Sequence, residues 1–351
     1  MGILIHIIRI SILCSIVFIP PSYGQVGGSK TYSFLDLTPS AQVAALGGKV
    51  NAIPGSDPSL AFYNPGLLDS TANNSLSLNF VDLFAGIGFG YVAYSRSYQN
   101  AGNFGAGIHY VNYGNFTEAG TSGVIDGTFF AHEYAINLTY SRSLPWFDST
   151  LLVGVNLKPL ISVFETYHSY GLLGDFGLTY RHPNRLFMAA LVLRNVGGQI
   201  KPYSDGGREP VPFELQLGLS QKLEYAPFRI SLILQRLEQG RMSPNKVNLN
   251  PAAGQNPVTE DDLKKGFDLV LDEVMRRVLI GVECYPFQGL TIRAGYNYNR
   301  RQEMKIENRP ALVGLSFGLG IQLSRIHVNY ARSVWHLAGA SDHFSVNVSF
   351  N

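Results

Sequence analysis

The chain ends in the stretch His343-Phe344-Ser345-Val346-Asn347-Val348-Ser349-Phe350-Asn351, and this stretch decides the fold. Successive side chains of an extended strand point to opposite faces, so Phe344, Val346, Val348 and Phe350 share one face. Serine and asparagine alternate with them and share the other face. This alternation, running to a penultimate aromatic residue, is typical of the strand that closes a lipid-facing β-barrel. The edge strand of a soluble sandwich would look the same, so the rest of the chain must decide.

The composition is compatible with a membrane barrel. Charged residues make up 15% of the 351 residues and aromatic residues 12%, whereas about a quarter of the residues in soluble domains are charged. Phenylalanine and tyrosine form the interfacial girdles of such barrels. The formal net charge is +2 and the chain has no run of lysine or arginine, so we expect no nucleic-acid partner.

The N-terminus carries the only long apolar stretch. Arg9 precedes the uncharged run Ile10–Ile19, and Pro20-Pro21 and small residues follow up to Gly24. This pattern predicts a secretory signal peptide over residues 1–24. An N-terminal membrane anchor is the alternative, but the run is shorter than the roughly 20 residues that cross a bilayer. Cleavage would leave Cys284 as the sole cysteine, which excludes an internal disulfide.

The mature chain then breaks into short alternating runs that predict fourteen strands. An even number of strands, many near the roughly 9–11 residues that cross a bilayer at a tilt, favours an all-β, antiparallel transmembrane barrel over residues 71–351. The predicted strands are Ser75–Phe84, Gly86–Arg96, Asn103–Tyr113, Phe130–Arg142, Ser149–Ile161, Ser169–Arg181, Arg185–Gly197, Pro212–Ser220, Pro227–Leu237, Arg276–Tyr285, Gly289–Asn299, Pro310–Ile321, Ser324–Val334 and Asp342–Phe350.

The lengths of the connections distinguish a barrel from a sandwich. Those after even-numbered strands are short, as at His182-Pro183-Asn184, whereas Gly114–Phe129, Gly198–Val211 and Glu238–Met275 follow odd-numbered strands and are long. An outer-membrane barrel with both termini in the periplasm has short periplasmic turns and long outer loops. We therefore expect the cell outer membrane as the location.

Two segments depart from the strand pattern. Residues 25–70 are rich in proline and glycine, include the helix-compatible piece Pro39–Leu46, and precede the first strand, so we expect them to fold into the lumen as a hatch or plug. In the long loop 238–275 we expect a short amphipathic helix that starts near Thr259. This helix either packs on the barrel mouth or faces a partner protein, and its apolar face comprises Leu263, Phe267, Val270, Leu271 and Val274.

Motifs for catalysis or metal binding are weak. Gly314-Leu315-Ser316-Phe317-Gly318 matches a hydrolase elbow, but it lies within a predicted strand instead of a strand-to-helix turn. The histidines lack metal-site spacing, so we expect no metal, no cofactor and no enzyme activity. An outer-membrane lipid hydrolase remains an alternative and requires a Ser/His pair on the outer wall. The predicted lumen charges either pair with one another and the plug or line a pore: Glu133, Glu214, Arg229, Arg293, Arg325 and His327.

The plug carries a family resemblance. Residues 57–68 (DPSLAFYNPGLL) resemble the Asn-Pro-Ala hatch motif of the long-chain fatty-acid transporter family, here as Asn64-Pro65-Gly66 with glycine in place of the usual alanine. Gln25–Gly28, Tyr32–Leu37, Ala44–Gly48, Leu78–Phe80, Gly107–Tyr110 and Gly114–Phe116 resemble one branch of that family, the PorV/PorQ barrels of the Bacteroidetes type IX secretion system.

This resemblance implies a non-enzymatic barrel that anchors a cell-surface attachment complex. In that complex the expected partners are PorZ, the sortase-like protease PorU and PorV, together with outer-membrane lipid and lipopolysaccharide. The barrel would hold them through outer loops such as Gly198–Val211 and Glu238–Met275. The wider family implies the alternative, uptake of a hydrophobic small molecule, which needs an apolar pocket by the hatch.

Overall fold

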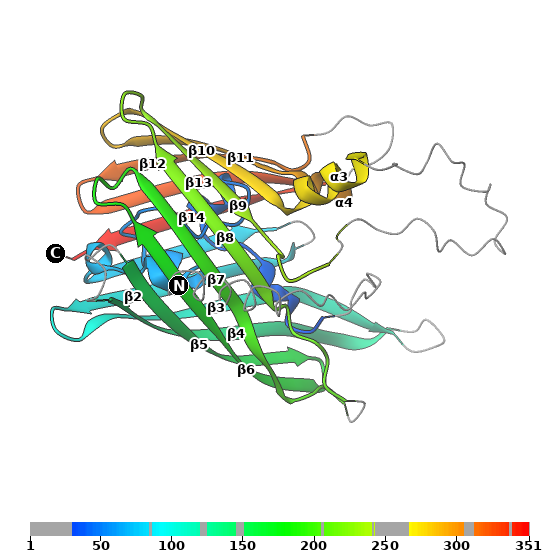
Figure 1. Ribbon diagram of the computed structural model, residues 1–351. Coiled ribbons are helices and arrows are strands. Elements are labelled where there is room, and N and C mark those ends of the chain that lie inside the picture. The colour runs from blue at the N-terminus through cyan, green and yellow to red at the C-terminus, as the bar shows by residue number, and fades with distance from the viewer. Residues whose placement is uncertain are drawn as a thin grey trace, which may run out of the picture.

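The strands of a computed structural model form a closed barrel (Figure 1). The structure describes residues 30–83, 86–119, 125–144, 151–204, 207–240, 242, 267–304, 312–336 and 339–350. Each strand is antiparallel to its two neighbours in sequence, and the last strand pairs with the first. The predicted fourteen-stranded antiparallel barrel is therefore confirmed.

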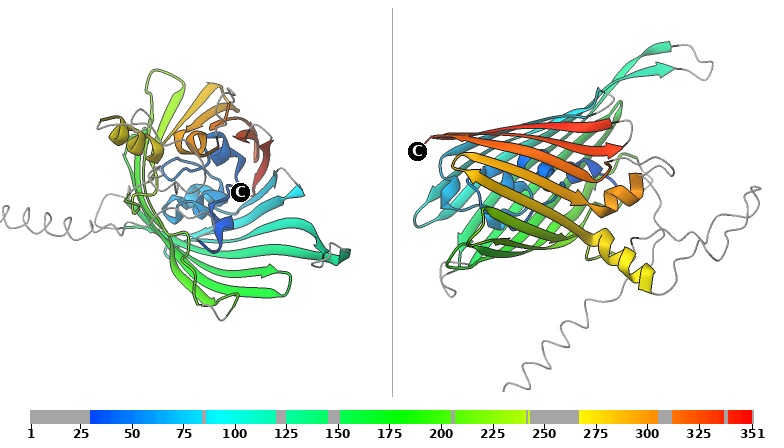
Figure 2. Two further views of the ribbon diagram at one scale, coloured as in Figure 1. Left: turned by 90° about the vertical axis from the view of Figure 1, so that its right-hand side faces the viewer. Right: turned by 90° about the horizontal axis from the view of Figure 1, so that it is seen from above.

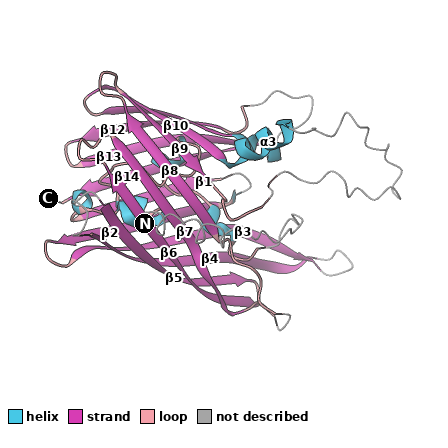
Figure 3. Ribbon diagram, viewed as in Figure 1, coloured by secondary structure: helices cyan, strands magenta, loops and turns pink. Residues whose placement is uncertain are grey.

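All fourteen predicted strands are present, with shifted ends. Their bounds are β1 Ser75–Asp82, β2 Gly88–Tyr98, β3 Gly102–Ala119, β4 Ile125–Ser143, β5 Leu151–Phe164, β6 Tyr167–Arg181, β7 Phe187–Lys201, β8 Glu214–Lys222, β9 Phe228–Leu234, β10 Val278–Phe287, β11 Leu290–Asn297, β12 Leu315–Leu323, β13 Ile326–His336 and β14 Gly339–Ser349. Strands predominate throughout the described residues, and the few helices lie inside the barrel or at one end of it (Figure 3).

The seam between β1 and β14 closes the barrel. Their register runs from Ser75 opposite Ser349 to Asp82 opposite Asp342, and the Phe350 amide also donates to the Asn74 carbonyl at 2.9 Å. Phe80 stands opposite Phe344, and both rings lie on the exterior, 58% and 50% exposed. The terminal strand thus has the seam position and the outward apolar face that its alternation predicts.

The two barrel faces follow the alternation of the sequence. Leucine, isoleucine, phenylalanine and tyrosine cover the outside, as at Leu78, Leu319 and Phe350, and polar or small residues face most of the lumen. This is the architecture of an outer-membrane protein. None of the helices formed by the described residues has the length and hydropathy needed to span a bilayer.

The ends of the barrel differ. At the end where β14 finishes, here the turn end, every connection joins an even-numbered strand to the next, as at Phe287–Leu290. At the opposite loop end, β9 and β10 are separated by residues 235–277, which include α3 (Phe267–Arg277). Figure 1 shows the C-terminus at the turn end and α3 with α4 (Tyr298–Met304) at the loop end.

Three expectations about the connections are wrong. Gly114–Phe129 is mostly strand, because β3 and β4, with 18 and 19 residues, continue past the barrel as a hairpin (Figure 2, right). Only two residues separate β5 from β6, so not every loop-end connection is long. Arg325 lies exposed in the turn between β12 and β13 and does not face the lumen.

A chain segment before β1 fills the barrel. It contains η1 (Ser33–Asp36), α2 (Ala41–Ala45), η2 (Pro58–Phe62), η3 (Pro65–Leu67) and η4 (Ser70–Ala72). Viewed along the barrel axis, it lies within the ring of strands (Figure 2, left). Nearly all residues from Thr31 to Ala72, here called the plug, are buried. Residues 25–29 of the predicted hatch lie outside the described residues.

The described plug begins at the loop end. The Thr31 amide donates to the Pro210 carbonyl in the β7–β8 connection at 2.9 Å, and the plug then runs to β1 at the turn end. The two ends of the described chain therefore lie at opposite ends of the barrel. The expectation of two periplasmic termini concerns residues 1–29 as well, and these lie outside the described residues.

The penultimate aromatic generates a test of assembly. We expect F350A to reduce barrel insertion, because Phe350 ends the seam strand on the lipid face and is 53% exposed. F344A is the matched control, since Phe344 lies on the same face of the same strand. Heat-modifiable migration on gels measures the folded fraction. Equal insertion of F350A and wild type would show that the terminal residue has no special part in assembly.

Candidate functional site in the barrel lumen

The plug contacts strands all around the barrel. Helix α2 packs on β11 to β14, η2 on β1 to β3, and η3 on β4 to β6. A fourteen-stranded barrel is too wide for its own side chains to fill, and here the plug occupies the remaining space of the lumen. The chemistry of the lumen is therefore set jointly by the plug and the inward-facing strand residues.

The hatch motif forms a local turn against the wall. Asn64 caps η3, because its Oδ1 accepts from the Gly66 amide at 2.8 Å. Its Nδ2 donates to the Asn51 carbonyl at 2.7 Å and to Thr179 Oγ1 on β6 at 2.9 Å. Pro65 supplies the fixed φ of the first η3 residue. One amide side chain thus links two parts of the plug to the barrel.

A pair of wall glycines admits the motif. Gly154 on β5 stands opposite Gly177 on β6. A Cβ atom at Gly154 would lie 2.2 Å from the Pro65 carbonyl carbon, and one at Gly177 would lie 2.0 Å from Asn64 Oδ1. Any larger residue at either position would occupy the space of the plug backbone.

A second glycine contact lies at β10 to β12. A Cβ atom at Gly295 would lie 2.2 Å from the Gly47 amide nitrogen, and one at Gly318 would lie 2.6 Å from the Ala45 Cβ. Gly281, opposite Gly295 in the ladder, similarly faces Leu46. The plug is therefore fitted at two places on the wall, each by close approach of backbones.

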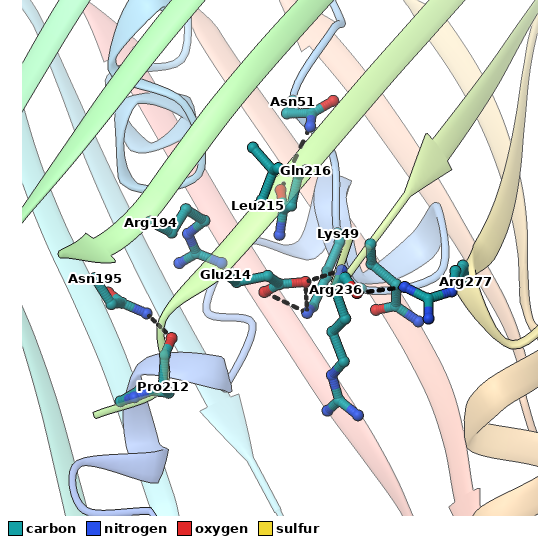
Figure 4. Close-up of polar contacts among 12 residues, drawn as sticks. Lys49, Asn51, Arg194, Asn195, Pro212, Glu214, Leu215, Gln216, Arg236 and Arg277 are labelled. Carbon is teal, nitrogen blue, oxygen red and sulfur yellow. Dashed lines mark hydrogen bonds and ion pairs between the residues drawn. The ribbon is translucent and has the colours of Figure 1, made fainter. Parts of the chain in front are cut away.

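Two ion pairs attach the plug to the barrel wall. Lys49 Nζ lies 2.7 Å from Glu214 Oε1 on β8 (Figure 4), and Arg181 on β6 pairs with Asp69. Glu214 therefore pairs with the plug, which was one of the two expected roles for the lumen charges.

A neutral hydrogen bond joins two parts of the plug itself. The Tyr63 hydroxyl oxygen accepts from the Ser40 amide at 3.1 Å, and burial raises the pKa of this phenol, so it stays neutral.

The loop-end half of the lumen contains an apolar compartment that the sequence pattern did not predict. Phe34 and Leu35 of η1 fill it and are 2% and 0% exposed. The compartment wall consists of the inward-facing residues Val81, Phe89, Val111, Ala135, Leu160 and Leu173 from β1 to β6. Barrel lumens are normally polar. An apolar wall therefore indicates a preference for hydrophobic contents.

Phe62 of the plug lies next to this compartment, because its ring and that of Phe34 both contact the His109 ring. Its ring lies 5.4 Å from Lys158 Nζ and 5.5 Å from Arg194 Cζ, and 5.2 Å from the rings of both Tyr91 and His109. Such cation–ring contacts stabilise buried cations by roughly 2 kcal/mol. Phe62 thus packs on charged residues of the wall, one of which, Arg194, also donates to the Leu35 carbonyl of η1.

The charged layer is a connected network. Lys158 Nζ lies 2.7 Å from Asp175 Oδ2 with both side chains fully buried, and it also donates to Asn195 Oδ1 at 2.9 Å. Asn156 donates to Asp175 and to Asn137. Removing one member of a buried ion pair costs about 3–5 kcal/mol, so this layer rigidifies the wall behind Phe62.

No catalytic arrangement is present on the outer wall of the described barrel. The one close Ser/His contact in this part of the chain joins Ser341 Oγ to His343 Nε2 at 2.8 Å, but both residues face the lumen and are 0% and 1% exposed. Ser341 Oγ also accepts from Trp335 Nε1, and Ser316 is fully buried. No group of three His, Cys, Asp or Glu among the described residues could hold a metal.

The loop helix presents its apolar side to solvent. Val270, Leu271 and Val274 of α3 are 62%, 47% and 49% exposed. Asp272 and Arg276 instead are buried, and the Tyr298 hydroxyl of α4 donates to Asp272 at 2.8 Å. Helix α3 therefore packs by its polar side, contrary to the first of the two expected alternatives. Leu263 lies outside the described residues, and Phe267 is the first residue of α3.

Comparisons with known proteins support the fold. No protein-family profile and no curated protein matches the sequence. The chain is similar in structure to the toluene transporter TbuX of Ralstonia pickettii, with a TM-score of 0.52, 13% identity, and coverage of 92% of this chain and 100% of that one. It is also similar to the toluene transporter TodX of Pseudomonas putida, with a TM-score of 0.52, 13% identity, and coverage of 89% and 96%. At this identity the similarity establishes a shared barrel fold.

The wall glycines generate a test of plug seating. We expect G177A to lower the unfolding free energy by about 1–3 kcal/mol, because the added methyl group overpacks against Asn64. The measurement is the temperature at which heat-modifiable migration is lost. G198A is the control, since a Cβ there meets nothing within 4 Å. If G177A and G198A melt together, the hatch motif is not seated on this glycine pair.

Proposed function

We propose that this chain is an outer-membrane barrel that admits small hydrophobic molecules through its lumen. The observation that carries the proposal is the apolar compartment of the loop-end half, now filled by Phe34 and Leu35. The shared fold of two toluene transporters supports it. In this proposal the loop end faces the cell exterior and the C-terminus faces the periplasm.

The plug itself indicates the size of the molecule. The Phe34 side chain is a benzyl group, which differs from toluene only by the bond to the backbone. Full burial of a phenylalanine side chain is favourable by roughly 1.5–3 kcal/mol, and a small aromatic ligand in the same place gains a comparable amount. Binding therefore requires η1 to leave, so that ligand and Phe34 exchange in one compartment.

Segment η1 has weak attachments compared with the hatch motif. Its carbonyl at Leu35 accepts from Arg194 at 3.5 Å, at the limit of a hydrogen bond. Tyr32, which precedes η1, has φ 55°, a left-handed conformation that costs a non-glycine residue roughly 1–2 kcal/mol. The Tyr32 hydroxyl bond to Ser169, 2.6 Å long, partly offsets that cost. The loop-end part of the plug is thus the part that moves at the least cost.

The exchange is testable with F34A. Removing the benzyl group leaves space that toluene can fill, so we expect toluene to raise the unfolding temperature of F34A more than that of wild type. The control is F80A, which removes a phenylalanine from the lipid-facing wall. Cells carrying F34A should also take up labelled toluene faster than cells carrying F80A. The same response to toluene in both variants would contradict binding in the compartment.

The second candidate function is a surface anchor in the type IX secretion system, with a PorQ-type role and PorZ, PorU and PorV as partners. The specific observation in its favour is the outward apolar side of α3, because an exposed apolar helix face next to a barrel mouth fits a protein partner. The long β3–β4 hairpin at the same end adds a further surface. The two functions use different parts of the molecule and do not exclude each other.

The anchor function is tested by a V270K/V274K double variant. We expect it to lose co-purification of PorZ from intact membranes and to leave secreted cargo unattached, because lysine disrupts the apolar side of α3. Uptake through the lumen should not change. L323K is the control, since Leu323 is an equally exposed apolar residue at the turn end. Normal cargo attachment by V270K/V274K would sink this candidate.

A further inference from the structure

A cavity of about 440 Å³ lies at the turn end of the lumen, away from the apolar compartment. It is formed where β8 and β10 to β13 reach this end of the barrel. Its polar lining includes Lys222, Tyr285, Arg293, Gln322, His327 and Asn329. The proposed carriage of hydrophobic molecules makes no use of this cavity.

The lining is cationic. It contains the cations Lys222 and Arg293 but no carboxylate. Arg229 adds a buried charge next to it, because the strand ladders place Arg229 opposite both Lys222 and Glu283. Two carboxylates lie near the lining: Glu283, which pairs with Arg293, and the plug residue Asp57, which interacts electrostatically with His327. A third carboxylate, Glu224, lies exposed in the turn two residues after Lys222. The cavity itself is therefore lined by cations, while the acids lie around it.

The arginines are fixed but keep free donors. Arg293 Nε donates to Glu283 Oε1 and Nη1 to Asn329 Oδ1, each at 2.9 Å, and the side chain is only 8% exposed. Its Nη2 has no partner within the described chain. Arg229 Nη1 donates to Ser220 at 3.1 Å, whereas its buried Nε has no partner among the described residues. Arg293 lines the cavity, and a guanidinium donor there is suited to an oxyanion, whereas Arg229 lies behind the lining.

A glycine keeps the cavity open. A Cβ atom at Gly320 would lie 2.7 Å from Arg293 Nη1 and 2.6 Å from Asn329 Oδ1. The arginine can therefore lie flat against β12 and present its remaining donor to the cavity. Lys222 is held nearby with its Nζ 5.6 Å from the centre of the Tyr285 ring.

The rim of the cavity is apolar and reaches the lipid-facing wall. Phe287 and Ile321 line it and are 66% and 48% exposed. Ile321 belongs to the outward face of β12, so one side of the cavity adjoins the apolar belt of the barrel. Basic pockets at the edge of a membrane protein bind phosphate head groups.

We propose that this cavity binds a phosphate group, either free or as the head group of a phospholipid in the adjacent leaflet. Arg293 and Lys222 bind the oxyanion, while Phe287 and Ile321 contact the acyl chains when a lipid supplies it. The inference goes beyond the carriage of hydrophobic molecules and does not depend on it.

The test is calorimetric titration of the purified full-length protein in a maltoside detergent and a phosphate-free buffer. The probes are inorganic phosphate and dihexanoyl-phosphatidylglycerol. K222Q/R293Q should weaken binding by about tenfold or more, since two charged donors are lost. The double variant could lose binding because the barrel misfolds without Arg293. K222Q alone is therefore measured as well, since Lys222 is exposed and outside the Arg293 network, and we expect it to weaken binding by several-fold. R325Q is the matched control, an exposed turn-end cation outside the cavity.

The two probes distinguish a site for free phosphate from a site for a phospholipid head group. Binding of inorganic phosphate that K222Q/R293Q weakens and R325Q leaves unchanged supports a site for free phosphate. Binding of the phosphatidylglycerol alone, with the same response to the variants, supports a head-group site. Absence of binding by both probes overturns the proposal, as does an equal loss in R325Q, which would indicate general attraction to a basic surface.

Discussion

The structure depends on the closure of β14 against β1. Within a bilayer an unpaired strand edge leaves backbone amides and carbonyls without partners, so the last strand must pair with the first. Closure of fourteen strands fixes a circumference that the barrel's own side chains cannot fill. The residues before β1 therefore become part of the interior, and the wall carries glycines such as Gly154, Gly177 and Gly295 where their backbone comes closest.

Closure and filling together divide the lumen into layers with different chemistry. The loop-end half of β1 to β6 is apolar and surrounds η1, the middle carries the buried pair of Lys158 and Asp175, and the turn end of β8 to β13 is cationic. Hydrophobic contents are therefore favoured in one half of the lumen and oxyanions at the opposite end. Segment η1 is held by the burial of Phe34 and Leu35, by the Tyr32 hydroxyl bond to Ser169 and by one long hydrogen bond from Arg194 to Leu35, so its movement breaks one contact with the charged layer.

The strands were predictable from sequence because lipid on one side and the lumen on the other impose a period of two, which local residues reveal. The closing position of Phe344–Phe350 followed from the same logic, whereas the plug was expected because residues 25–70 lack this period and precede the first strand. The apolar compartment was not predictable, because Val81, Leu160 and Leu173 come from strands far apart in sequence and each looks like an ordinary strand residue. The glycine pair of Gly154 and Gly177 was equally hidden, since only the register of β5 and β6 brings them together. The polar orientation of α3 depends on the buried pair of Asp272 and Arg276, which outweighed the apolar periodicity of its exposed side.

The central claim is that Phe34 and a small hydrophobic ligand compete for one compartment. The most direct measurement is a crystal structure of the protein with 4-bromotoluene, in which anomalous scattering locates the bromine. We expect bromine between Phe89, Leu160 and Leu173, with Phe34 displaced from its present position. Bromine found only on the outer wall, with Phe34 still in the compartment, would contradict it.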